Sequence, residues 1–127
     1  MAGLGLSTIG QIAVPVRDIE RATAFYRDVL GMKYLFSAGN LAFFNCDGVR
    51  LMLDIVEDKR FDHPASVIYY KVTDIQAATA ALREKDVVVV GEPHLIAPMP
   101  DHDLWMAFFE DPDANVFSLM SEVPRKT

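Results

Sequence analysis

Two apolar runs of similar length predict the first strand of each half of the chain. They span residues 9–16 and 66–72, and each is followed two residues later by an aspartate, Asp18 or Asp74. Both aspartates precede apolar residues at helical spacing, so each predicts an N-cap and a helix directly after the strand. The two segments align at a constant offset of 56 residues, the separation of Asp18 and Asp74. The chain is therefore predicted to repeat one unit.

Three further apolar runs follow each predicted helix. The turn-forming sequences Gly39-Asn40, Asp47-Gly48 and Asp111-Pro112-Asp113 separate several of them, which is typical of strands joined by hairpins. Each half then reads βαβββ, and the fold class is α+β. We expect a single domain over residues 1–127, with module one at 9–55, a linker at 56–64 and module two at 65–121.

Residues 92–103 have no counterpart in the first half. This segment holds three prolines together with His94, His102 and Asp103. We expect an inserted loop, because prolines interrupt regular structure and long loops often act as lids or carry functional residues.

Charge and composition exclude several classes of protein. The net charge of −6 and pI near 4.9 argue against nucleic-acid binding, which needs a clustered basic surface. No apolar run is long enough for a membrane span. Only one cysteine is present, Cys46, so no internal disulfide can form, and we expect a cytoplasmic protein.

Four segments, in this order and spacing, carry a family resemblance: Val14–Ile19, Phe25–Met32, Val72–Ile75 and Phe108–Asn115. With them the chain resembles the vicinal oxygen chelate superfamily, which includes glyoxalase I, bleomycin-resistance proteins, extradiol dioxygenases and methylmalonyl-CoA epimerase. The resemblance implies two βαβββ modules that form a curved mixed sheet around a cleft. It also implies a homodimer.

In metal-using members, the resemblance implies one ligand from each of the first, fourth, fifth and eighth strands. Gln11 is compatible with the first position, whereas Val67 stands where histidine is expected and Ser118 where a carboxylate is expected. The fourth strand offers residues 51–53, in an uncertain register. A divalent ion needs several nitrogen or oxygen donors, so we expect no metal cofactor, with Gln11 as the remaining candidate ligand.

Strand alternation and the position of the loop predict the residues that line the cleft. The candidate ligand-binding residues are Gln11, Val67, Tyr69, Trp105, Ser118 and Met120, and Phe109 and Met52 are further candidates. Such a surface suits a small apolar or aromatic ligand. Arg50 lies in a predicted strand, and its face cannot be assigned from the pattern.

Three functional hypotheses remain open. The first is metal-free binding of a small molecule. The second is a metal-dependent lyase, isomerase or dioxygenase with a relocated site, and the third is a metal-free enzyme in which His102 or His94 transfers protons.

Overall fold

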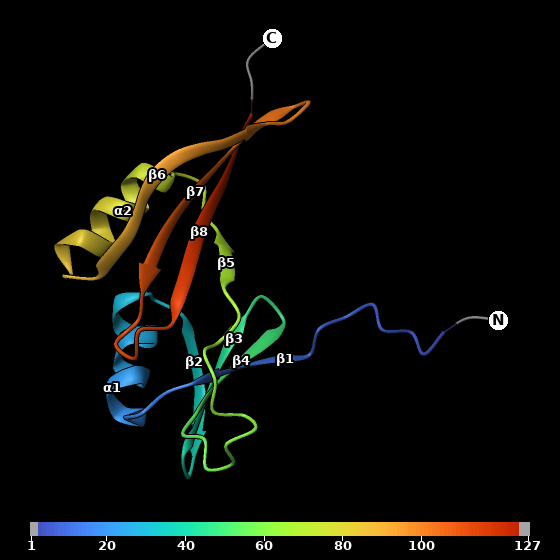
Figure 1. Ribbon diagram of the computed structural model, residues 1–127, viewed down its shortest axis with the longest axis vertical. Coiled ribbons are helices and arrows are strands. Elements are labelled where there is room, and N and C mark those ends of the chain that lie inside the picture. Colours follow the sequence, from blue (N-terminus) through green and yellow to red (C-terminus); the bar gives the residue numbers. More distant parts are fainter. Residues whose placement is uncertain (1–2, 125–127) are drawn as a thin grey trace. The chain divides into compact units, whose positions relative to one another are not determined.

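The computed structural model of the chain describes residues 3–124, and the chain divides into two compact units between Ala65 and Ser66. Each unit contains one helical segment and one four-stranded mixed sheet (Figure 1). The predicted α+β class and the βαβββ repeat are confirmed. That the two modules form one domain stays a prediction.

The first unit has its sheet in the order β1-β4-β3-β2, with β1 and β4 parallel and the other pairs antiparallel. Its elements are β1 (Gln11–Pro15), α1 (Ile19–Ala24), a π-helical continuation η1 (Phe25–Val29), β2 (Lys33–Ala38), β3 (Leu41–Cys46) and β4 (Val49–Asp54).

The second unit repeats this topology in the order β5-β8-β7-β6, with β5 and β8 parallel. Its elements are β5 (Ile68–Lys71), α2 (Ile75–Glu84), β6 (Val88–Pro98), β7 (His102–Glu110) and β8 (Val116–Pro124).

Both predicted N-caps are confirmed. The Asp18 side chain accepts a hydrogen bond from the backbone N–H of Arg21 at 3.1 Å, and Asp74 accepts one from Ala77 at 3.0 Å. Each carboxylate satisfies a donor that the first helical turn leaves free and lies at the positive end of the helix. The repeat therefore starts both helices by the same chemistry.

Each sheet buries the face that its own helix covers. In the first unit this face carries Val14, Phe44 and Leu53, and in the second it carries Phe109 and Phe117, whose rings stack at 5.5 Å. Residues in between point to the opposite face, because side chains alternate along a strand. We call these opposite faces the open face of the first sheet and the open face of the second sheet.

The prediction of an inserted loop at residues 92–103 was wrong. Strand β6 continues to Pro98 and β7 begins at His102, so the segment is an extended hairpin whose connection is only 99–101. Pro93 is accommodated because β6 is an edge strand and its pairing with β7 shifts register between Gly91 and His94. Proline lacks an N–H donor and is tolerated at edges and bulges, so its presence did not exclude a strand.

Candidate functional site: the open faces of the two sheets

Gln11 lies on the open face of the first sheet and is hydrogen-bonded within it. It stands opposite Arg50 in the parallel pairing of β1 and β4, and its Oε1 accepts a hydrogen bond from Arg50 Nε at 2.8 Å. Its Nε2 lies 3.5 Å from the sulfur of Met52. The amide that the sequence left as a possible metal ligand therefore positions a guanidinium group.

An aromatic surface adjoins this pair. Phe36 and Phe43 stack with ring centroids 4.7 Å apart, and Met52 is the partner of Phe43 across β3 and β4. The Arg50 Cζ lies 5.4 Å from the centroid of the Phe43 ring. Sequence reasoning left the face of Arg50 open and did not single out Phe36 or Phe43. Leu51 and Leu53 are both buried, and side chains alternate along a strand. This apolar pattern could have shown that Arg50 lies on the opposite face.

Strand pairing resolves the uncertain register on the fourth strand. Met52 pairs with Ala13, and Ser118 pairs with Tyr69. Because Ala13 and Tyr69 are equivalent in the repeat, Met52 and Ser118 are equivalent as well. On the ligand pattern that the family resemblance implies, the four equivalent positions in this chain are Gln11, Met52, Val67 and Ser118.

Ser118 occupies the centre of the open face of the second sheet, yet it is 0% exposed. It lies in one row with Tyr69 on β5 and Phe108 on β7. The Tyr69 and Phe108 rings meet edge to face at 6.0 Å, which encloses the small side chain between them. The Ser118 hydroxyl donates to the carbonyl oxygen of Ala107 at 2.9 Å. This row is an aromatic surface with a buried hydroxyl below it.

The next row along this face contains Met120 and His94. Met120 pairs with Met106, which pairs in turn with His94 on β6. The His94 ring lies 6.4 Å from that of Phe108, and its Nδ1 donates to the carbonyl oxygen of Glu92 at 2.8 Å. His94 therefore extends the aromatic surface and presents Nε2 as its other nitrogen.

His102 belongs to a charged cluster at the far end of β7. Its Nδ1 lies 2.7 Å from Asp101 Oδ1, and its Nε2 lies 3.5 Å from Glu122 Oε2. Lys71 Nζ also contacts Glu122, at 2.9 Å. The hydrogen bond and charge of Lys71, with a smaller contribution from His102, hold the pKa of Glu122 below its usual value. Since His102 and Met106 are four residues apart on β7, about 13 Å at strand spacing, His102 and His94 do not form one catalytic pair.

Trp105 and Phe109 lie on the face of the second sheet that α2 covers, not on the open face with Ser118. Both alternate along β7 with Phe108, and Phe109 is fully buried. The expectation that either shares a face with Ser118 was wrong, because it depended on an unknown strand parity. Val67 precedes β5 and is 41% exposed.

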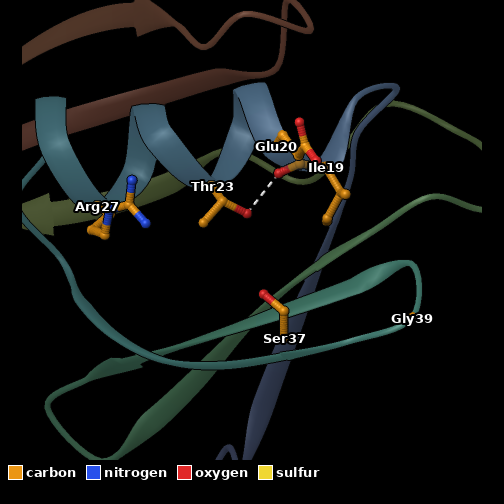
Figure 2. A pocket seen from close by; sticks show the side chains of 6 residues that line it. All are labelled: Ile19, Glu20, Thr23, Arg27, Ser37 and Gly39. Carbon is orange, nitrogen blue, oxygen red and sulfur yellow. Dashed lines mark hydrogen bonds between the residues drawn. The ribbon is translucent and has the colours of Figure 1, made fainter.

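A groove of about 440 Å³ lies elsewhere in the first unit, between α1 and the β2–β3 turn (Figure 2). Two of its polar side chains have local partners. Thr23 Oγ1 donates to the carbonyl oxygen of Ile19 at 2.6 Å, and Arg27 forms an ion pair with Asp28 at 2.9 Å. The groove includes none of the predicted ligand-binding residues.

The four ligand-equivalent positions do not fit a divalent metal ion. The Gln11 side-chain oxygen accepts a hydrogen bond from Arg50, and the Ser118 hydroxyl donates one to a backbone carbonyl. The Val67 side chain has no atom that could bind a metal. Met52 offers only a thioether, a soft ligand. Throughout residues 3–124, no three His, Cys, Asp or Glu side chains gather where they could hold a metal. Within the same range, no helix is long and apolar enough to cross a membrane.

Known proteins resemble the chain over nearly its whole length. It is 29% identical over 118 residues to the metallothiol transferase FosB of Lysinibacillus sphaericus (strain C3-41), covering 88% of this chain and 80% of the relative. Among solved structures, TnmS3, an antibiotic binding protein from Streptomyces sp. CB03234, is 26% identical, with a TM-score of 0.72 and coverage of 94% of this chain and 99% of TnmS3.

Lactoylglutathione lyase from Agrobacterium tumefaciens has the same fold, with a TM-score of 0.71 at 20% identity and coverage of 91% of this chain and 93% of the lyase. A family model matches residues 8–119. The chain belongs to the Glyoxalase/Bleomycin resistance protein/Dioxygenase superfamily.

Proposed function

We propose that this chain binds a small apolar or aromatic ligand on the open faces of its sheets, without the metal used by other members of the superfamily. One observation carries the proposal. At the eighth-strand position where a metal ligand is expected, Ser118 is enclosed beneath the rings of Tyr69 and Phe108. The site of a potential metal donor has become part of an aromatic surface.

The exposure of these aromatic side chains supports a ligand. Tyr69 is 45% exposed and Phe36 is 48% exposed, and both lie on an open face beside a second ring. An aromatic pair contributes about 0.5–1.5 kcal/mol beyond the burial of its area, so a planar ligand gains most by stacking here. TnmS3, which shares the fold at 26% identity, is an antibiotic binding protein, and this also supports a binding role.

Ligand-induced thermal stabilisation tests the proposal. 2-Naphthylmethanol, a neutral bicyclic aromatic alcohol, is expected to raise the melting temperature, since a ligand at 100 times its Kd stabilises the folded state by about 2.7 kcal/mol. Tyr69→Ala and Phe108→Ala should each reduce the rise. Phe61→Ala is the matched control, because Phe61 is 60% exposed and lies outside every strand.

The outcomes separate clearly. A rise that Tyr69→Ala and Phe108→Ala reduce and Phe61→Ala leaves intact supports the proposal. A rise that all three variants retain places the ligand away from the open face of the second sheet and contradicts the assignment of that face. No rise across neutral and charged aromatic compounds would contradict ligand binding itself.

A metal-dependent activity is the second candidate, because the relatives include a metallothiol transferase and a lactoylglutathione lyase. Such a lyase, isomerase or dioxygenase would need donors beyond the four ligand-equivalent positions. Elemental analysis of the purified protein distinguishes this candidate from the first. A stoichiometric metal that is lost in Gln11→Ala would favour it.

A metal-free enzyme is the third candidate, and the 2.7 Å contact between His102 Nδ1 and Asp101 favours it. A carboxylate on Nδ1 orients an imidazole for proton transfer, and Nε2 of His102, 3.5 Å from Glu122 Oε2, would exchange the proton. Any activity of this kind should persist in the presence of a chelator and disappear in His102→Ala. Loss of the activity in His94→Ala instead would identify His94 as the proton-transfer group.

A homodimer in the cytoplasm completes the proposal. Exposed Leu95 and Ile96 on the edge strand β6 support self-association, and the single free cysteine, Cys46, supports a reducing compartment. Light scattering after size exclusion measures the mass of the particle directly.

A further inference from the structure

We propose that the open face of the first sheet selects aromatic ligands that carry an anionic group, and that Arg50 binds the anion. This inference rests on the proposed function, because it names the chemical class of the ligand. It starts from the state of the Arg50 guanidinium, which is exposed beside the aromatic ring of Phe43.

Arg50 is fixed in place without being neutralised. Its Nε donates to Gln11 Oε1 at 2.8 Å, and its Cζ lies over the Phe43 ring. Both partners are uncharged. Within the described residues 3–124 it forms no ion pair with a carboxylate. Four other arginines do form one: Arg17, Arg27, Arg60 and Arg83. The remaining N–H groups of Arg50 are therefore oriented donors for an anion from outside.

Strand pairing arranges this face in two rows. The polar row contains Lys33, Asn45, Arg50 and Gln11, and the apolar row contains Phe36, Phe43, Met52 and Ala13. Adjacent rows are three residues apart on β2, where the pairing shifts register, and two residues apart along β1, β3 and β4, about 7 Å. A bicyclic aromatic compound with one carboxylate has this length, so its rings can lie on the apolar row while its carboxylate reaches Arg50.

The other charges on the face favour the same orientation. Lys33 lies in the polar row with Arg50, and its ammonium adds a second positive charge at that end. Asp54 lies in the row beyond Met52, opposite Leu41, and is about 13 Å from Arg50 along β4. An anion is therefore attracted to the end with Arg50 and repelled from the end with Asp54.

Two isosteric probes test the charge requirement by titration calorimetry. 2-Naphthoate and its neutral amide, 2-naphthamide, differ in the charged group but share the rings. The naphthoate is expected to bind at least tenfold more tightly, because hydrogen bonds to a charged group are the stronger kind. Its affinity should also fall as salt is raised, since the anion is bound near the surface.

Variants then assign this preference to Arg50. Arg50→Gln should weaken naphthoate binding about tenfold and leave naphthamide binding unchanged, while Arg50→Lys should restore part of the loss because it keeps the charge but not the planar fork. Gln11→Ala should cause a smaller loss, since Gln11 only positions the guanidinium. Arg60→Gln is the matched control: it removes the same charge from a residue paired with Asp58 outside the sheet.

Each result decides between the inference and the function on which it rests. If naphthoate and naphthamide bind equally, and Arg50→Gln changes neither affinity, the anion preference is wrong while aromatic binding stands. If Arg60→Gln weakens naphthoate as much as Arg50→Gln, the effect is one of net charge and the assignment to Arg50 is wrong. If neither probe binds, the inference fails together with the proposed function.

Discussion

Replacing Ser118 by glutamate restores a carboxylate at the eighth-strand position and tests whether this site can still serve a metal. Ser118 is 0% exposed beneath Tyr69 and Phe108. A buried glutamate must either lose its hydration or take up a proton. Protonation at pH 7 costs about 3.7 kcal/mol, from roughly 1.4 kcal/mol for each pH unit above the ordinary pKa near 4.3. The larger side chain adds about 1–3 kcal/mol of overpacking.

Urea unfolding at several pH values measures this cost, with Ser118→Gln as the matched control. Glutamine has the same shape and overpacks equally, but it carries no charge. The pKa of the buried glutamate is raised in the folded state, so the unfolded chain ionises first as pH rises. Ser118→Glu should therefore match Ser118→Gln near pH 4 and then lose stability by up to about 1.4 kcal/mol per pH unit.

Two results would refute this reasoning. Equal stability of the Glu and Gln variants at pH 7 would mean that water reaches position 118, so the two rings do not enclose it. A large stabilisation of Ser118→Glu by Ni²⁺ or Zn²⁺ would mean that the remaining donors suffice to bind a metal. That result is not expected, because the Gln11 side-chain oxygen already accepts a hydrogen bond from Arg50 and the Val67 side chain has no donor atom.

Three further predictions concern the scaffold and the charged cluster. Asp18→Ala and Asp74→Ala should each destabilise the fold by about 1 kcal/mol in urea unfolding, because each removes an N-cap hydrogen bond. Asn in place of either Asp should restore most of the lost stability. Unchanged stability of the Ala variants would mean that the caps are dispensable. Phe109→Ala should cost about 3–5 kcal/mol, since its ring is fully buried, and a loss below 1 kcal/mol would contradict its place in the core. Lys71→Met should raise the depressed pKa of Glu122 in an NMR titration, and an unchanged pKa would exclude the ion pair in solution. In the unchanged protein the pair should stabilise the fold at pH values above the ordinary glutamate pKa. This stabilisation should be lost as the pH falls through the lower pKa of Glu122 in the folded state.

The sequence predicted the repeat and its local chemistry because these depend on neighbouring residues. Asp18 and Asp74 cap helices through bonds to residues three positions later. The turn at Asp47-Gly48 was also predictable, since both residues take positive φ, 49° and 91°, as a tight hairpin requires.

Site residues were harder to predict because they depend on strand parity and on pairing between distant strands. Trp105 was assigned to the wrong face, although a shift of one residue would have corrected it. The pairing of Gln11 with Arg50, 39 positions apart in the chain, has no local signal. Prolines at 93 and 98 suggested a loop, because the chain alone does not show that β6 is an edge strand.

The two halves of the repeat have diverged in different directions at equivalent positions. In the first unit, Gln11 and Met52 support the Arg50 guanidinium and a stacked aromatic pair. In the second unit, Val67 lacks a donor atom and Ser118 is sealed beneath two rings. Neither unit therefore has an imidazole or a carboxylate at its two ligand-equivalent positions, and substitutions confined to one unit leave the other unit's two positions unchanged. On the ligand pattern that the family resemblance implies, two of the four positions lie in each unit, so imidazole or carboxylate donors would have to be introduced in both units. The aromatic side chains that we propose bind the ligand are already present on each open face.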